Sequence, residues 1–258
     1  MEDLRGKTAL ITGVANKRSI AFAVAQDLAK HGARLCLTYL PVAKDSAEAK
    51  LKALAEEAGA ELLLPLDAGD PASLQALFQT LRERWGKLHV LVHAIASAKR
   101  EELSGAFSDT TWEGYQLAHQ ISSYSLIAMI REGRGLLLNE GASVTTLSYI
   151  GSERAVHNYN VMGSAKAALE ANVRYLAMEF GTQNVRFNAV SAGPIRTLSA
   201  SGIKDFLDLM HNARDHAPLQ RDIEPEEVAH AVTFLSSSLA SGITGQVIYV
   251  DGGYNIYG

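Results

Sequence analysis

The chain has 258 residues, of which 47% are hydrophobic and 20% are charged, as in ordinary soluble proteins with a substantial core. Its formal net charge of −4 and its scattered lysines and arginines exclude a bulk role in binding nucleic acid. A single cysteine, Cys36, excludes an internal disulfide and favours a reducing compartment. No run approaches the roughly 18 apolar residues that span a bilayer, and none resembles a signal peptide. We therefore expect a soluble cytoplasmic protein without a membrane partner.

Short apolar runs alternate with longer amphipathic segments along the chain. The apolar runs, nearly continuous as in buried parallel strands, occupy 7–12, 33–39, 61–66, 88–94, 142–148, 185–191 and 246–250. Helical patterns occupy 19–31, 43–58, 71–85, 112–131, 158–181 and 224–237. Asp70-Pro71 and Glu224-Pro225 are typical of an N-cap followed by a first-turn proline. The alternation predicts an α/β protein with a single-domain Rossmann-type doubly wound fold, in which a seven-stranded parallel sheet has helices on both faces.

No linker or repeat divides the chain, so we predict one domain over residues 1–258. Two connections, at about 95–111 and 192–218, fit the alternation poorly. Ligands of such sheets bind beyond the carboxyl ends of the strands. We therefore expect these two connections to shape a substrate pocket.

The first apolar run leads into a candidate nucleotide-binding turn. Gly13 is followed by a loop and by a helix that begins near Ser19, where exposed amides can hold a pyrophosphate. The usual three-glycine pattern is reduced to Gly13, with Ala15 and Ser19 at positions where further small residues are needed. A plain strand-to-helix turn with a serine cap is the alternative.

The second run is followed by no carboxylate that could hold a ribose 2′-hydroxyl, and by no arginine that could at once meet a 2′-phosphate. Lys17, Arg18 and Lys44 are the candidates for such a phosphate, with solvated side chains as the alternative. We favour NADH as cofactor, with NADPH as the second choice.

Later runs end in residues that suit a dinucleotide. Asp67 follows the third run and could accept a hydrogen bond from an adenine amino group, although a turn or capping role is equally compatible with its position. Ile95 and Ala96 follow the fourth run and are apolar enough to line a nucleotide. Ile195 and Thr197 follow the sixth run, where a nicotinamide ring would lie.

Tyr159 and Lys166 are seven residues apart in NYNVMGSAK, and Tyr149 precedes them at the end of the fifth run. Seven residues on an α-helix place two side chains within roughly 20° of one face, about 10 Å apart along the axis. A phenol and an ammonium on one face can serve one ligand by donating a hydrogen bond and by holding charge and hydroxyls. A surface helix that carries both residues is the alternative.

The motifs together resemble the enoyl-acyl carrier protein reductases, a divergent branch of the short-chain dehydrogenase/reductase family. The resemblance extends over residues 6–253 and rests on TGVANKRSIA, HQISSYSL, TLSYIGSERAVHNYNVMGSAKAALEANVRYLA, RFNAVSAGPIRTLSASGIKDF and GITGQVIYVDGGY. Most relatives in the wider family place the catalytic lysine four residues after the tyrosine, where this chain has Gly163. Lys166 therefore fits the spacing of the enoyl-reducing branch.

The resemblance implies roles for individual positions. The implied catalytic residues are Tyr149, Tyr159 and Lys166. The implied cofactor-binding residues are Gly13, Ala15, Ser19, Ile20, Asp67, Ala68, Ile95, Lys166, Ile195 and Thr197. The implied substrate-binding residues are Ala96, Ser97, Tyr149, Tyr159 and Met162. The implied reaction is hydride transfer from NADH to the β-carbon of a trans-2-enoyl thioester on acyl carrier protein, in type II fatty acid synthesis, by a homotetramer.

Two segments depart from the family pattern. Residues 97–100 read Ser-Ala-Lys-Arg, where relatives often have an aromatic residue and a proline. After GIKDF, Leu207 and Asp208 stand where relatives commonly have basic residues, which leaves Lys204 as the local cation for an acidic carrier. Both changes bear on acyl-chain preference and on carrier protein against coenzyme A as the substrate handle.

Other polar side chains near the proposed site receive supporting roles. We expect Thr146 and Ser148 to support the backbone and its packing, and His93, His119 and His157 to be structural or rim residues, since none has metal-ligand spacing. Two rival functions remain: a carbonyl reductase or alcohol dehydrogenase of the same fold, and a dinucleotide-binding regulator without turnover.

Overall fold

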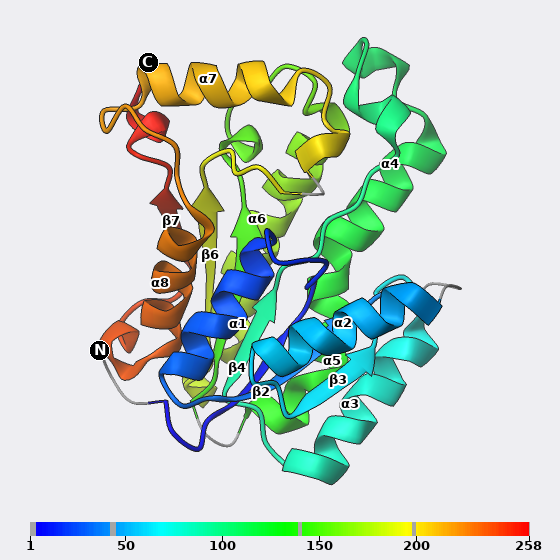
Figure 1. Ribbon diagram of the computed structural model, residues 1–258, viewed down its shortest axis with the longest axis vertical. Coiled ribbons are helices and arrows are strands. Elements are labelled where there is room, and N and C mark those ends of the chain that lie inside the picture. Colours follow the sequence, from blue (N-terminus) through cyan, green and yellow to red (C-terminus); the bar gives the residue numbers. More distant parts are fainter. Residues whose placement is uncertain (1–3, 42–44, 139–140, 198–199, 258) are drawn as a thin grey trace.

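The computed structural model describes residues 4–41, 45–138, 141–197 and 200–257. It contains one seven-stranded parallel sheet with the strand order β3-β2-β1-β4-β5-β6-β7 (Figure 1). The strands are β1 Thr8–Ile11, β2 Arg34–Tyr39, β3 Leu62–Pro65, β4 Val90–His93, β5 Ser143–Ser148, β6 Arg186–Ala192 and β7 Val247–Val250. The predicted fold class is confirmed. The strand order reverses between β1 and β4, which is where a doubly wound sheet opens a crevice for a nucleotide.

The helices form two layers around this sheet. They are α1 Ile20–Lys30, α2 Asp45–Glu57, α3 Pro71–Trp85, α4 Trp112–His119, α5 Ser125–Leu137, α6 Asn160–Phe180, α7 Phe206–His216 and α8 Pro225–Ser236. Because neighbouring strand residues point to opposite faces, Ala9 and Ile11 of β1 join a core with α1 and α8, whereas Leu10 joins a core with α3, α5 and α6. Burial of the strands on both faces explains their nearly continuous apolar sequence.

The two proline-marked helix starts are confirmed. Asp70 caps α3 by accepting hydrogen bonds from the amides of Ala72 at 3.0 Å and Ser73 at 3.3 Å. At α8 the amide of Glu224 donates to the Glu227 carboxylate at 3.0 Å, as in a capping box.

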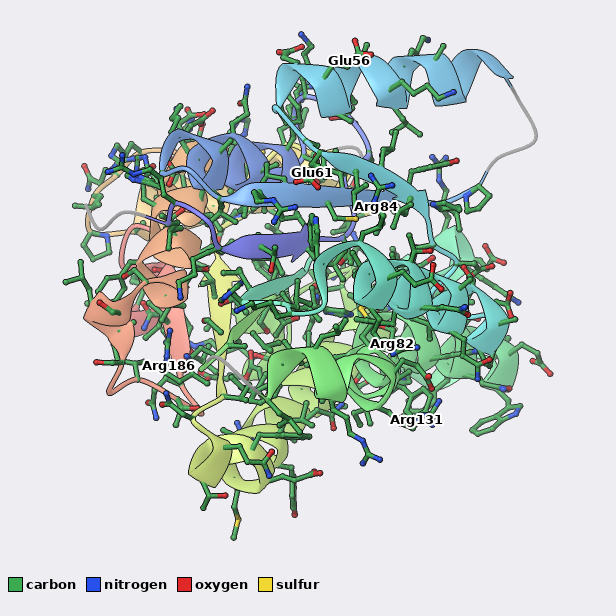
Figure 2. The ribbon with its side chains drawn as sticks, turned by 90° about the horizontal axis from the view of Figure 1, so that it is seen from below. Glu56, Glu61, Arg82, Arg84, Arg131 and Arg186 are labelled. Atoms are coloured by element: carbon green, nitrogen blue, oxygen red, sulfur yellow. The ribbon has the colours of Figure 1, made fainter. Side chains whose placement is uncertain are left out.

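The edge strand β3 is tied to β2 by a carboxylate at its start. Glu61, labelled in Figure 2, accepts hydrogen bonds from Arg34 at 2.8 and 2.9 Å and from the Trp85 indole at 3.1 Å. The hydrogen bond from Arg34 is the main cause that lowers the pKa of Glu61 to about 2.

Two predicted elements were wrong in detail. The single helix expected over 112–131 is α4 and α5 joined by a π-helical turn, Gln120–Tyr124. Side chains bond to carbonyls of this turn: Ser125 Oγ donates to the Ile121 carbonyl at 2.6 Å, and the Asn172 amide donates to the Ser123 carbonyl at 3.4 Å. A π turn needs such alternative partners, because it interrupts the regular ladder of backbone hydrogen bonds.

The connection expected over 192–218 contains the helix α7, which the alternation of strands and helices did not reveal. This helix lies across the top of Figure 1, beyond the carboxyl ends of β6 and β7. None of the helices in the described part of the chain combines the length and the apolar character needed to cross a membrane.

Candidate active site

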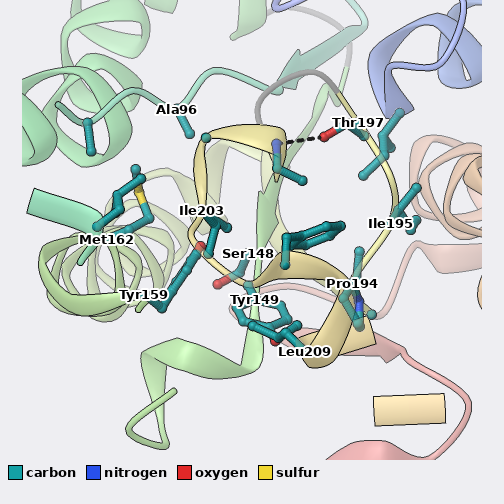
Figure 3. Close-up of a pocket in the computed structure, with 18 of the residues that line it drawn as sticks. Ala96, Ser148, Tyr149, Tyr159, Met162, Pro194, Ile195, Thr197, Ile203 and Leu209 are labelled. Carbon is teal, nitrogen blue, oxygen red and sulfur yellow. Dashed lines mark hydrogen bonds between the residues drawn. The ribbon is translucent and has the colours of Figure 1, made fainter. Parts of the chain in front are cut away.

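A cavity of about 540 Å³ lies beyond the carboxyl ends of β5 and β6 (Figure 3). Its wall is built from Ile20 at the start of α1, from residues 96–98, 100 and 103, from residues 148, 149, 159 and 162, and from residues 192–195, 197, 200, 202, 203, 206 and 209. Both connections that we expected to shape a pocket thus contribute to it. The predicted site residues in this wall are Ile20, Ala96, Ser97, Tyr149, Tyr159, Met162, Ile195 and Thr197.

The two tyrosines meet at the floor of the cavity. The rings of Tyr149 and Tyr159 have centroids 4.9 Å apart and an interplanar angle of 67°, which is an edge-to-face contact (Figure 3). Burial raises the pKa of both phenols above their ordinary value, and for Tyr159 the charges of Tyr149 and Glu170 add to the shift. Both phenols therefore stay protonated at neutral pH and act as hydrogen-bond donors.

Tyr159 is fixed by a tight backbone on both sides. Asn158 and Asn160 have positive φ angles of 61° and 39°, which asparagine tolerates better than most residues. The Asn158 amide donates to the Lys204 carbonyl at 3.1 Å and to Asp205 at 3.2 Å. The Asn160 amide donates to the carbonyls of residues 104 and 105 at 3.4 and 3.3 Å. Each asparagine therefore ties Tyr159 to one of the two connections that form the cavity wall.

Lys166 lies in the second turn of α6, and Tyr159 is the N-cap residue of that helix. Its side chain is buried, and Nζ donates to the Leu147 carbonyl at 2.7 Å, next to the cavity residue Ser148. Burial lowers the pKa of the Lys166 ammonium to about 8, and the carboxylate of Glu170 opposes that shift. The amine is therefore mostly charged at pH 7 and loses its proton in the mildly alkaline range.

The unusual lysine spacing has a steric basis. At Gly163, where the wider family places its lysine, a Cβ would lie 2.7 Å from the Gly151 carbonyl oxygen. Gly151 is itself constrained, because a Cβ there would lie 2.4 Å from the Tyr159 ring. The close packing of residues 150–152 on α6 thus leaves no room for a side chain at 163.

The predicted nucleotide turn lies where β1 meets β4. Gly13 has a φ of +81°, and a Cβ there would lie 2.0 Å from the Ala94 carbonyl oxygen. Thr12 Oγ1 donates to the Val92 carbonyl at 3.0 Å and accepts from the Ala94 amide at 3.1 Å, which holds the ends of β1 and β4 together. Glycine is therefore required at residue 13 for both conformation and space.

The start of α1 presents its amides near this turn. Ser19 is the N-cap, and its hydroxyl donates to the Asn16 carbonyl at 2.7 Å and accepts from the Phe22 amide at 3.3 Å. The serine-cap alternative is thus observed at the same residue as the predicted pyrophosphate contact. Ala15 is exposed in the loop, whereas Ile20 reaches the cavity.

Changing Gly13 to alanine is expected to weaken NADH binding at least about tenfold and to lower the free energy of unfolding by about 1–3 kcal/mol, because the backbone conformation and the Ala94 contact are both lost. Fluorescence titration with NADH and urea unfolding measure the two effects. The matched control is Gly242→Ala, since a Cβ at Gly242 meets nothing within 4 Å. Equal behaviour of the two variants would contradict the assignment of a close approach at Gly13.

Three of the predicted cofactor-binding residues, Asp67, Ala68 and Ile95, lie outside the cavity wall. Asp67 is exposed, and its Oδ1 accepts from the Gly69 amide at 2.8 Å, so the turn alternative is observed there. Ala68 and Ile95 are partly buried against the core that contains α3 and α5. The Ser97 backbone is held at the cavity by Ser122, whose hydroxyl accepts from its amide at 3.0 Å.

Several cavity residues were not predicted. Phe206 and Leu209 of α7 line the cavity, and Ala213 is buried on the same helix. Their i, i+3, i+7 spacing is the signal by which α7 could have been found. Ser148, expected only to support packing, lines the cavity and donates a short hydrogen bond to Glu170.

His93 is structural in its contacts, as expected. Its two ring nitrogens bond to Thr146 and Ser125, each at 2.8 Å, and the side chain is 1% exposed. Burial, with a smaller effect from the charge of Lys166, lowers the pKa of His93 to about 3. The imidazole is therefore neutral next to the proposed site. His119, also expected at the rim, bonds to the Tyr115 carbonyl at 3.0 Å.

Comparison with known proteins agrees with this geometry. The family model for enoyl-(acyl carrier protein) reductase matches residues 13–255. Over 100% of both chains, the protein is 49% identical to the enoyl-[acyl-carrier-protein] reductase [NADH] of a Nostoc species. It is 45% identical to the Escherichia coli enzyme of the same name, over 98% of this chain and 95% of that one.

A solved structure agrees equally well. The Bacillus cereus enoyl-acyl carrier protein reductase, determined with NADP+ and an indole naphthyridinone, matches with a TM-score of 0.94 at 45% identity, over 100% of both chains. The family resemblance predicted from the sequence is confirmed. The chain belongs to the enoyl-acyl carrier protein reductase family.

Proposed function

We propose that the protein is an NADH-dependent enoyl-acyl carrier protein reductase that saturates the double bond of a trans-2-enoyl thioester in fatty acid elongation. The observation that carries the proposal is the phenol of Tyr159 at the floor of a 540 Å³ cavity, with the buried Lys166 on the same helix. The names of the full-length relatives support the reaction class and the cofactor. The location that fits this pathway is the cytoplasm.

The residues present fit a nicotinamide dinucleotide. Gly13 lets the end of β1 pass close to the Ala94 carbonyl, directly before the loop that leads to the amides at the start of α1. Lys166 would hold the nicotinamide ribose hydroxyls, Ile195 and Thr197 would frame the ring, and Asp67 would lie at the adenine end. NADH, when bound, supplies the hydride that adds to the β-carbon of the substrate.

The protein's part in the reaction is electrostatic. Hydride addition leaves an enolate whose negative charge gathers on the thioester oxygen. The protonated phenol of Tyr159 donates a hydrogen bond to that oxygen, so it stabilises charge that develops only in the transition state. Tyr149 packs against Tyr159, lines the acyl pocket and assists protonation. The Lys166 ammonium adds positive potential behind the phenol.

The preference for NADH is also part of the proposal. Lys17, a candidate ligand for the 2′-phosphate of NADPH, forms an ion pair with Glu57 at 2.5 Å. The amide of Arg18, another candidate, donates to Asn16 in the loop at 2.8 Å. Lys44 lies outside the described residues. The Glu57 carboxylate beside Lys17 would repel the 2′-phosphate of NADPH, and this repulsion supports NADH as the preferred cofactor.

The substrate handle and the assembly complete the proposal. One catalytic domain spans residues 1–258, and its two connections shape the pocket for an acyl chain on acyl carrier protein. Lys204 is exposed beside the cavity wall and would meet the acidic carrier. Homotetramer formation is supported by large apolar side chains left exposed on α4 and α6, namely Trp112, Tyr175 and Met178.

The test is the absorbance of reduced nicotinamide on mixing the purified protein with a trans-2-enoyl thioester. We expect consumption of NADH at least as fast as of NADPH, a saturated thioester as product, and faster turnover with the carrier-protein form than with the coenzyme A form. A ketone substrate run in parallel tests the carbonyl-reductase alternative. Reduction of the ketone without enoyl turnover, or NADH binding without any turnover, would overturn the proposal.

A further inference from the structure

Glu170 is a buried carboxylate directly behind the proposed catalytic residues. It lies on α6 one turn beyond Lys166 and is 5% exposed. The hydroxyl of Ser148, itself a cavity residue, donates a short hydrogen bond to its Oε1. A carboxylate is rarely buried in a core without a partner of opposite charge, because desolvation disfavours the ionised form. Its burial at this place therefore calls for a role.

The strand β5 holds Glu170 and Lys166 side by side. Lys166 bonds to the carbonyl of Leu147, and Glu170 bonds to the hydroxyl of the next residue, Ser148. The ammonium and the carboxylate are thus anchored to consecutive residues at the carboxyl end of one strand, where Ser148 lines the cavity.

The other titratable groups around Lys166 come from the neighbouring elements. His93 of β4 is buried and neutral, and Tyr159 at the start of α6 is protonated. Tyr249 of β7 also feels the charge of Glu170, but its hydroxyl donates to Glu153 at 2.6 Å. Of these groups only Glu170 brings negative charge to Lys166 from within the core.

We propose that Glu170 is a positioning residue for the reaction: its carboxylate, anchored through Ser148, is the fixed counter-charge that keeps Lys166 an ammonium in the working pH range. Lys166 can then donate hydrogen bonds to the ribose hydroxyls and add positive electrostatic potential near the Tyr159 phenol. The inference rests on the proposed function only for its consequences in NADH binding and turnover, since the protonation state of Lys166 is a property of the protein alone.

A merely structural role would be to hold the end of β5 against α6. Three substitutions separate the two roles. Glu170→Gln removes the charge and keeps the shape, Glu170→Asp keeps the charge, and Ser148→Ala removes the hydrogen bond while the carboxylate remains. Glu170→Met is a second neutral variant, because an apolar side chain of similar volume can replace a buried charge without loss of the fold.

The first experiment follows NADH binding to the full-length protein by fluorescence between pH 6 and pH 10, without substrate. The wild-type affinity is expected to fall with a midpoint near the pKa of Lys166, about 8. In Glu170→Gln and Glu170→Met the midpoint should move down by about one pH unit, because an adjacent opposite charge is lost. Affinity at pH 6 should stay near the wild-type value. Glu170→Asp and Ser148→Ala retain the carboxylate, so their midpoints should stay closer to the wild-type value than those of the two neutral variants.

The second experiment reads Lys166 without any cofactor. The Cε resonance of Lys166 in protein labelled with ¹³C-lysine, assigned by its absence in Lys166→Met, gives the same midpoint directly. If the wild-type protein binds no NADH, the proposed function fails, and this titration still tests Glu170. An unshifted Lys166 midpoint in the neutral variants would overturn the inference, as would a loss of affinity that is equal at every pH. Failure of both neutral variants to fold would also count against it, because it would assign Glu170 to the fold.

Discussion

Replacing Tyr159 by phenylalanine is expected to lower kcat for enoyl thioester reduction by about 10²–10³-fold, the usual effect of removing one donor to a developing oxyanion. The ring and its contact with Tyr149 remain, so the cavity and the fold should be unchanged. NADH affinity should stay within about twofold of the wild type, since in the proposed site the lost hydroxyl faces the substrate rather than the ribose. Stopped-flow single turnovers separate the chemical step from binding.

The control for this variant is Tyr175→Phe. Tyr175 lies on α6 but outside the cavity wall, so the loss of its hydroxyl should leave kcat unchanged. Undiminished reduction by Tyr159→Phe, in a protein that still binds NADH, would refute the role of the phenol. A pH-independent loss is expected below about pH 9, because burial keeps the Tyr159 phenol protonated over that range.

Replacing Lys166 by methionine is expected to weaken NADH binding by about 10- to 100-fold and to lower kcat as well, because charge-assisted hydrogen bonds to the ribose and positive potential near Tyr159 are lost together. This double effect distinguishes Lys166 from Tyr159, whose loss changes only the chemical step. Fluorescence titration with NADH and initial rates at saturating NADH measure the two parts.

The pH dependence of NADH affinity tests the same role of Lys166. In the proposed site protonated Lys166 is the form that binds NADH, and its pKa is about 8, so we expect wild-type affinity to be present below that pH and to be lost above it. Lys166→Met should bind weakly without this alkaline loss. Lys166→Arg should also lack it, because arginine stays charged, while binding more weakly at pH 7 through altered geometry. An alkaline loss that persists in both variants would assign the titration to another group.

Much of the fold could be predicted from the sequence because buried parallel strands have a distinct apolar signature. Each of the seven predicted strands overlaps an observed one, and Asp70 and Glu224 mark true helix starts. The helix α7 was missed because it follows cavity-wall residues such as Pro194, Ile195 and Thr197, which have no periodic pattern. The π turn was missed because its partners, such as Asn172, come from a different helix.

The candidate site was predictable to the extent that local spacing determines it. The seven-residue interval places Lys166 in the second turn of the helix that Tyr159 caps, and the structure adds the reason that residue 163 must be glycine. The role of Glu170 was not predicted, because it depends on a hydrogen bond from Ser148 of β5. Contacts between distant segments of this kind are set by packing, which a single sequence does not reveal.

The backbone on either side of Tyr159 has a consequence for how this enzyme can diversify. Through Asn158 and Asn160, both connections that form the cavity wall are hydrogen-bonded to the residues that flank Tyr159. A change in either connection that accommodates a longer or bulkier acyl chain is therefore expected to move the Tyr159 ring as well. Remodelling either connection would therefore disturb Tyr159 and lower the reaction rate. We expect selection to alter acyl-chain preference through side chains that point into the cavity instead.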